Sequence, residues 1–144
     1  MNNFKYSNIG LKITEGFEGL RLVPYQDGNG IWTNGYGNTH NVDPSVTITQ
    51  FQAESDLATN IAWAMSVVNK SVTVQLNQQE ADALCDFVFN VGSGNFSKSS
   101  LLRDINAGHF ELAAADFEKW SECAGKVCAG LMRRRVAEAA EFNS

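Results

Sequence analysis

Only one stretch near the start of the chain carries the pattern of a β-hairpin. Two short β-prone runs, 22–27 and 31–33, flank the turn Asp27-Gly28-Asn29-Gly30, whose composition suits a turn between paired strands. From residue 49 onward the apolar residues recur at helical spacing instead. The pattern therefore predicts an α+β fold that is mostly helical, with a small N-terminal hairpin lobe facing a helical lobe across a cleft.

Capping residues and apolar stripes predict where the helices lie. Ser7 is a candidate N-cap, and Thr49 with Gln52 and Asn77 with Glu80 have capping-box spacing. Gly92 should end the third helix, and further helices are expected at about 98–107, 110–120 and 131–142. The residues expected on the inward faces are Ile9, Ile13, Phe17, Phe51, Leu57, Ile61, Val68, Ala81, Leu84, Cys85 and Val88.

Length and charge limit the class of protein. A chain of 144 residues with 44% apolar residues suits one compact domain, 1–144. No apolar stretch is long enough to span a membrane, and the first 15 residues lack a signal-peptide core. The net charge of −5 argues against a nucleic-acid partner. Five of the 11 basic residues lie between Lys119 and Arg135, which leaves a local basic wall open.

Cysteines and histidines do not have the spacing of a metal site. Cys85 has apolar neighbours and is expected in the core, whereas Cys123 and Cys128 lie in a loop-like stretch where an oxidising compartment would allow a disulfide. His40 and His109 are far from each other in the sequence. The glycine-rich turn resembles part of a calcium loop but lacks the later ligands. We therefore expect no metal and no cofactor.

Two carboxyl groups near the hairpin have the pattern of a glycosidase site. Glycoside hydrolysis commonly uses one protonated and one ionised carboxyl group on either side of the scissile bond. Glu18 ends the first helix beside Phe17 and Leu20, where partial desolvation would help it retain its proton. Asp27 lies at the glycine-rich turn, where water has access, and the Thr33 hydroxyl across the turn is placed to hold the attacking water.

The stretch from Glu18 to Gly37 resembles the T-even and lambdoid phage lysozymes of glycoside hydrolase family 24. The family orders its catalytic residues as Glu, eight residues, Asp, five residues, Thr, and Glu18, Asp27 and Thr33 have this spacing. Glu15 does not. The surrounding matches are Gly19-Leu20-Arg21-Leu22, Tyr25, Gly30, Gly35, Gly37, Leu76-Asn77-Gln78, Ala83-Leu84, Phe89-Asn90-Val91-Gly92, Ser100-Leu101-Leu102-Arg103, Gly130-Leu131 and Arg133-Arg134-Arg135.

The resemblance implies roles for these residues. Glu18 would be the general acid, Asp27 would activate or position water, and Thr33 would orient that water. Asn90 would line the cleft and hydrogen-bond sugar, and Arg134 would lie near Glu18 and order it. The family is usually described as inverting, which implies carboxyl groups about 6.5–9.5 Å apart.

The chain departs from the family pattern at two neighbouring positions. Asn38 stands where the family has a histidine that serves mainly as a structural ion-pair partner, and His40 comes two residues later. Asn34 follows the threonine where an apolar residue is usual. We expect the first change to affect stability more than activity.

Other polar and aromatic residues have simpler interpretations. Trp63 and Trp120 are expected in the core rather than as sugar platforms, whereas Trp32, beside the hairpin turn, is a candidate sugar contact. The run from Arg133 to Arg135 is also typical of a solvated helix face.

Three functions fit the pattern. The first is a muramidase that hydrolyses the β-1,4 bond between N-acetylmuramic acid and N-acetylglucosamine in peptidoglycan. The second is a lytic transglycosylase, which Asp27 and Thr33 disfavour. The third is a wall-binding module with a degenerate site, suggested only by Asn38. By resemblance, we expect a monomeric endolysin that waits in the host cytoplasm until a separate holin opens the inner membrane; a toxin or antibacterial effector is an alternative setting.

Overall fold

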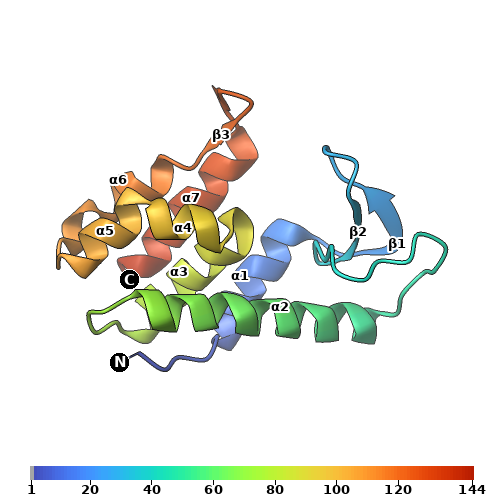
Figure 1. The fold of residues 1–144 in the computed structure, drawn as a ribbon, viewed down its shortest axis with the longest axis horizontal. Coiled ribbons are helices and arrows are strands. Elements are labelled where there is room, and N and C mark those ends of the chain that lie inside the picture. Colours follow the sequence, from blue (N-terminus) through green and yellow to red (C-terminus); the bar gives the residue numbers. More distant parts are fainter. Residues whose placement is uncertain (1) are drawn as a thin grey trace.

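The computed structural model describes residues 2–144 and contains a mostly helical chain with two small sheets (Figure 1). In chain order, the elements are α1 (Asn8–Glu18), β1 (Arg21–Gln26), β2 (Trp32–Gly35), α2 (Gln50–Ser71), α3 (Gln78–Val91), α4 (Ser93–Lys98), α5 (Ser100–Asn106), the 3₁₀ helix η1 (Phe110–Leu112), α6 (Ala113–Glu118), β3 (Glu122–Cys123), β4 (Lys126–Val127) and α7 (Ala129–Phe142). The predicted α+β class is confirmed.

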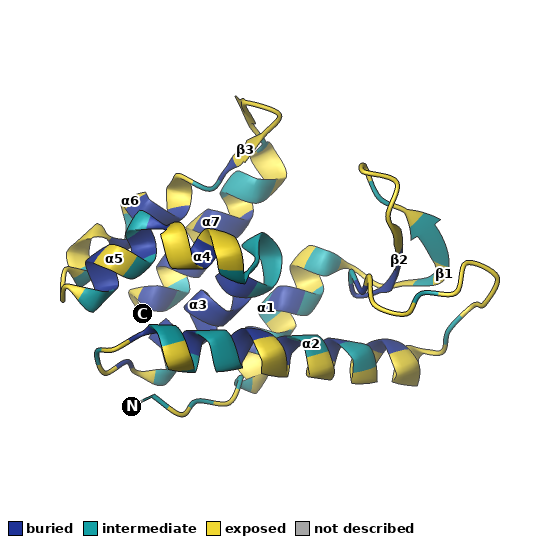
Figure 2. Cartoon of the chain, viewed as in Figure 1, coloured by how far each residue is buried: buried dark blue, intermediate teal, exposed yellow. Residues whose placement is uncertain are grey.

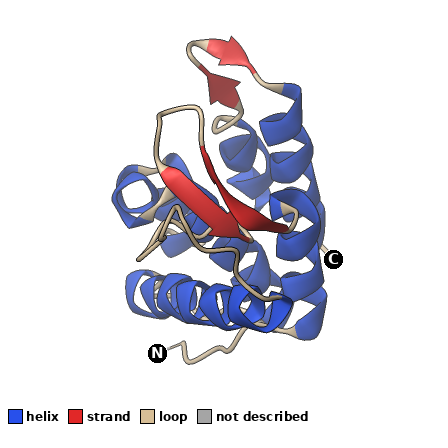
Figure 3. Ribbon diagram, turned by 90° about the vertical axis from the view of Figure 1, so that its right-hand side faces the viewer, coloured by secondary structure: helices blue, strands red, loops and turns tan. Residues whose placement is uncertain are grey.

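The long helix α2 joins the two lobes. The antiparallel pair β1–β2 stands over its N-terminal half, and α3 to α7 gather over its C-terminal half (Figure 1). Turning the molecule shows β3–β4 as a separate small pair, away from β1–β2 (Figure 3). The hairpin lobe and the helical lobe therefore both pack against one continuous helix of 22 residues.

Local capping explains where the main helices begin. The Ser7 hydroxyl accepts a hydrogen bond from the Gly10 amide, and Asn77 and Glu80 form the predicted reciprocal capping box. Thr49 caps α2 as predicted, but the Gln52 side chain donates to Asp56 (2.8 Å), so the second half of that predicted box is wrong. Gly92 ends α3, as predicted, with φ of +91°.

The core lies where α2, α3 and the later helices meet (Figure 2). The predicted inward residues of α2 after its first turns are buried, as is the whole predicted stripe of α3. Phe87 is at the centre of an aromatic cluster, with ring centroids 6.1, 5.6 and 5.9 Å from those of Phe96, Phe117 and Trp120. Edge-to-face pairs at these distances each add about 0.5–1.5 kcal/mol beyond burial.

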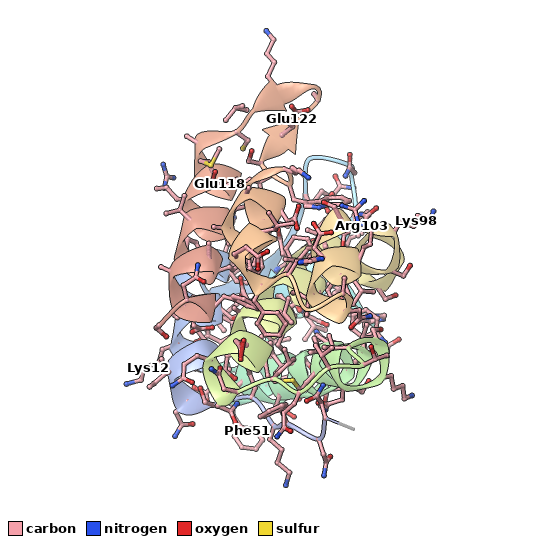
Figure 4. All side chains as sticks on the ribbon, turned by 90° about the vertical axis from the view of Figure 1, so that its left-hand side faces the viewer. Lys12, Phe51, Lys98, Arg103, Glu118 and Glu122 are labelled. Carbon is pink, nitrogen blue, oxygen red and sulfur yellow. The ribbon has the colours of Figure 1, made fainter. Side chains whose placement is uncertain are left out.

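Three residues predicted to face inward, on α1 and at the start of α2, are exposed. Ile9 is 72% exposed and Phe17 is half-exposed, whereas α1 buries Gly10 and Thr14 against α3. The buried contacts of α1 are polar, because Thr14 donates to Asp86 of α3 (2.6 Å), so hydrophobic periodicity points to the wrong side. Phe51 is 79% exposed at the start of α2, beyond the helical lobe, and lies at the periphery in Figure 4.

The region after α3 is more divided than predicted. The helix expected at 98–107 is α5, and it is preceded by α4, which was not predicted. The two helices are separated at Ser99, whose hydroxyl donates to the Phe96 carbonyl and accepts from the Leu102 amide. One side chain thus ends α4 and begins α5. The loop expected around residues 123–128 contains the β3–β4 hairpin, in which Glu122 pairs with Val127. Among residues 2–144, no helix combines the length and apolar character needed to cross a bilayer.

Candidate active site

A cavity of about 400 Å³ lies between the hairpin lobe and the helical lobe. Its lining residues are Glu18, Tyr25, Asp27, Thr33, Gly37, Thr39, His40, Asn60, Trp63, Phe89 and Asn90. The structure thus brings together the three candidate catalytic residues and Asn90. Trp32 and Arg134 are outside the described lining of this cavity, although Arg134 contacts Glu18 directly.

The turn itself orients Asp27 and Thr33. The Asp27 carboxylate oxygen Oδ1 accepts hydrogen bonds from the amides of Asn29 (2.8 Å) and Ile31 (2.9 Å). The Thr33 hydroxyl donates to the Ile31 carbonyl (2.9 Å), and Thr33 pairs with Tyr25 across the hairpin. Since its hydrogen is used in this bond, the buried Thr33 hydroxyl is left as an acceptor.

Glu18 is held by a distant arginine rather than by apolar neighbours. Its Oε2 accepts from Nη1 of Arg134 at 2.6 Å, and its side chain is 17% exposed. Phe17 and Leu20, which were expected to desolvate it, are themselves half-exposed. The Arg134 guanidinium lies 5.5 Å from the centre of the Phe17 ring, so this ring packs against the arginine. The predicted partial desolvation of Glu18 is thus present, but its direct partner is an arginine.

Arg134 is part of a buried charge network between α3 and α7. Its Nε and Nη2 donate to the two oxygens of Asp86, each at 2.9 Å, and Thr14 donates to the same carboxylate. Burial opposes ionisation of Asp86, but hydrogen bonds from Glu138 and Arg134 and the arginine charge outweigh it, so its pKa is lowered to about 2. The Asp86 charge therefore persists at neutral pH and fixes Arg134.

Arg135 is also buried, with no exposed surface. It pairs with Glu138 (Nε to Oε1, 2.7 Å) and donates to Asn90 (2.8 Å). Burial, followed by the hydrogen bond to Asp86, raises the pKa of Glu138 well above its usual range. A solvated arginine face is therefore wrong for Arg134 and Arg135, and these two cations do not contribute to a basic wall on the surface.

The approach of Glu18 to the turn that follows β2 depends on a glycine. Gly37 has φ of +73°, and a Cβ built there would overlap Oε1 of Glu18. Side chains rarely adopt this backbone conformation, and this one would also displace the carboxyl group. Glycine at position 37 therefore allows the turn to form and leaves room for the Glu18 carboxyl group.

Gly37→Ala should lower the rate of the glycoside hydrolysis expected from the sequence by about 100-fold, because small displacements of a reacting group are costly. It should also reduce the free energy of unfolding by about 1–2 kcal/mol through backbone strain. Gly16→Ala is the control, since a Cβ there meets nothing within 4 Å and should preserve activity. Turnover assays and urea unfolding of both variants measure these effects; normal activity in Gly37→Ala would contradict the proposed carboxyl position.

Comparison with known proteins identifies the family. The sequence model described as phage lysozyme matches residues 15–138. The chain belongs to the phage lysozyme family. It is 44% identical over 142 residues to an endolysin of Acyrthosiphon pisum secondary endosymbiont phage 1, an alignment that covers 96% of this chain and 97% of that protein.

Solved structures show the same fold. The muramidase domain of SpmX from Asticaccaulis excentricus superposes with a TM-score of 0.92 at 34% identity, covering 99% of each chain. A mutant of P22 lysozyme superposes with a TM-score of 0.86 at 33% identity, covering 99% of this chain and 100% of the other. The protein is thus a lysozyme-type glycosidase with the phage lysozyme fold.

The two departures from the family pattern contact each other. Asn38 Nδ2 donates to Asn34 Oδ1 (3.1 Å), and the same two residues exchange both backbone hydrogen bonds. Asn38 Oδ1 accepts from Asn60 of α2 (3.2 Å). A neutral network of amides therefore ties this phage lysozyme's hairpin lobe to α2.

The distribution of the three tryptophans between core and surface differs from the prediction. Trp63 is 49% exposed and lines the cavity, so its expected place in the core is wrong, whereas Trp120 packs against Phe87 as predicted. Trp63 also borders a second cavity of about 840 Å³ beside α2. Trp32 is 39% exposed, and its role as a sugar contact stays a prediction. Helical spacing carried the signal, because Trp63 comes two positions after the inward-facing Ile61 and so lies on the opposite side of α2.

Cys85 is buried as predicted, and Cys123 and Cys128 are both free thiols in this structure. Their mutual interaction raises the pKa of the Cys123 thiol and lowers that of Cys128. Among residues 2–144, there is no group of three or more His, Cys, Asp or Glu side chains suited to a metal ion.

The Glu141 side chain of α7 changes its protonation state close to neutral pH. Burial, together with the negative charges of Asp82 and Asp86, raises its pKa from 4.5 to about 7. The folded state therefore binds this proton more tightly than the unfolded state, and the group's contribution to stability falls as pH rises from 4.5 to 7.

Glu141→Gln should remove this effect. Because the side chain is half-exposed and screened by solvent, we expect the variant to be more stable than the parent at pH 8 by about 1 kcal/mol. The two proteins should be equally stable at pH 4. Urea unfolding at a series of pH values measures the difference, and a difference that is constant with pH would contradict the assignment.

Proposed function

We propose that the protein hydrolyses the β-1,4 bond between N-acetylmuramic acid and N-acetylglucosamine in bacterial peptidoglycan, with residues 1–144 acting as one catalytic domain. The observation that carries the proposal is a single cavity lined by Glu18, Asp27 and Thr33, with Glu18 held by buried Arg134. No metal or cofactor is needed for this reaction.

Glu18 acts as the general acid. It donates a proton to the glycosidic oxygen as that bond breaks, and the carboxylate that forms is stabilised by the 2.6 Å hydrogen bond from Arg134. Arg134 thus acts through Glu18, and its burial speaks against direct contact with sugar.

Asp27 and Thr33 act on the water. Asp27 accepts a proton from the attacking water, and the Thr33 oxygen accepts the second hydrogen of that water because its own hydrogen is bound to Ile31. The water is thereby oriented towards the anomeric carbon on the side opposite Glu18. This arrangement corresponds to inversion at that carbon.

We propose the biological setting from the family. As a monomeric endolysin, the protein would accumulate in the host cytoplasm, reach the wall when a separate holin opens the inner membrane, and release phage by lysis. Neither nucleic acid nor stable membrane insertion has a role in this proposal.

Mass spectrometry of fragments released from purified peptidoglycan tests the reaction. Hydrated, reducing N-acetylmuramic acid ends are expected from water attack. Anhydro ends would overturn hydrolysis in favour of a transglycosylase. A folded protein that releases no fragments would overturn both in favour of a wall-binding module.

A further inference from the structure

Asn90 faces the cleft from the last turn of α3 with one end of its amide already occupied. Its Oδ1 accepts a hydrogen bond from Arg135 Nη2 at 2.8 Å, on the interior side of the residue. Asn90 also lines the cavity that contains Glu18 and Asp27. The oxygen and the NH₂ group lie on opposite sides of the planar amide, so this bond turns the NH₂ group towards the cleft.

The Arg135 side chain is held too firmly to let this amide turn over. It has no exposed surface, both oxygens of Glu138 lie within 3.0 Å of its nitrogens, and its guanidinium lies 5.1 Å from the centre of the Phe87 ring. A flipped amide would place its NH₂ group against the guanidinium, leaving two buried donors facing each other. The donor is therefore preorganised before any substrate binds.

The two successive arginines of α7 have parallel tasks. Arg134, which is paired with Asp86, holds Glu18, and Arg135, which is paired with Glu138, holds Asn90. Glu18 and Asn90 both line the cavity. Neither arginine is placed to contact sugar, since both are buried. Each converts a flexible polar side chain into a group of fixed direction.

We propose that Arg135 is a positioning residue that fixes Asn90 as a hydrogen-bond donor to the carbonyl oxygen of an N-acetyl group on the bound glycan. The inference rests on the proposed function. Sugar hydroxyl groups both donate and accept, so they would not require a fixed amide. The N-acetyl carbonyl only accepts, and both sugars of the peptidoglycan strand carry one.

Kinetics with paired substrates test this assignment. The substrates are soluble, uncross-linked glycan strands freed of peptide, and the same strands after chemical removal of their acetyl groups. Asn90→Asp keeps the contact with Arg135 but replaces the donor with an acceptor. It should raise KM for the acetylated strands by about tenfold and leave kcat within about twofold, as expected for loss of uniform binding.

Two further variants separate the effect of the orientation of the Asn90 amide from the effect of an added negative charge. Arg135→Lys keeps a cation beside Glu138 but lacks the planar fork, so we expect KM to rise by about threefold. Asn3→Asp adds the same charge at an exposed position away from the cavity and should leave KM unchanged. On de-acetylated strands, the advantage of the native Asn90 over Asn90→Asp should disappear. Thermal unfolding confirms that each variant is folded.

The outcomes distinguish this inference from the proposed function. Normal hydrolysis by the parent with equal KM in Asn90→Asp would overturn the inference alone. The same KM ratio on both substrates would overturn the acetyl assignment. Failure of the parent to hydrolyse either strand would overturn the proposed function and, with it, this inference.

Discussion

Glu18→Gln is expected to lower the rate of peptidoglycan hydrolysis by about 1000-fold, within the range that general acid catalysis contributes. Glutamine has the same shape and still offers Arg134 an acceptor, so the hydrogen bond at 2.6 Å has a replacement. What it lacks is the acidic proton for the leaving oxygen. Turnover on purified peptidoglycan and the unfolding midpoint in urea separate loss of chemistry from loss of fold.

Glu15→Gln is the matched control for this experiment. Glu15 lies on the same helix, one turn before Glu18, and is outside the described lining of the cavity. Its substitution should preserve activity. Near-normal hydrolysis by Glu18→Gln would reject Glu18 as the acid, whereas an equal loss in both variants would point to the helix rather than to the carboxyl group.

Arg134→Met should produce the largest loss of stability. Removal of the guanidinium leaves Asp86 buried without its cation, and breaking a buried ion pair in this way costs about 3–5 kcal/mol. Activity should fall as well, because Glu18 loses the group that orients it. The midpoint and slope of urea unfolding give the change in free energy.

Arg133→Met supplies the control on the same helix. Arg133 is exposed, and its substitution should change the free energy of unfolding by less than about 0.5 kcal/mol. If the two variants lose equal stability, the buried network is not what holds α7 against α3. A double variant, Arg134→Met with Asp86→Asn, tests the pair directly. If Arg134 and Asp86 act together, the double variant should lose less stability than the sum of the two single losses.

The hairpin, and the proximity of Asp27 and Thr33 across its turn, were predictable because their geometry is local. Asp27 and Thr33 are oriented by hydrogen bonds to residues no more than four positions away. The caps at Ser7 and Asn77 are equally local, since each side chain bonds an amide three residues ahead. Short-range contacts of this kind are present in the amino-acid order itself, so pattern and spacing were sufficient.

The surroundings of Glu18 and Asn90 depend on contacts between distant segments. Arg134 is 116 positions from Glu18, and Arg135 is 45 positions from Asn90. A run of arginines at the end of a chain looks the same whether it is solvated or buried, and only the packing of α7 on α3 distinguishes the two cases.

Packing also decided which helix faces are buried. α1 turns its polar Thr14 face inward because Asp86 and Asp82 of α3 supply hydrogen-bond partners there. α2 exposes Phe51 because it begins beyond the helices that cover its C-terminal half (Figure 1). It exposes Trp63 because that side of the helix borders the cavity rather than the core. Periodicity in the sequence identifies an amphipathic helix, but the neighbour that covers a face exists only once the chain has folded, and that neighbour determines whether the face is core, cleft or solvent.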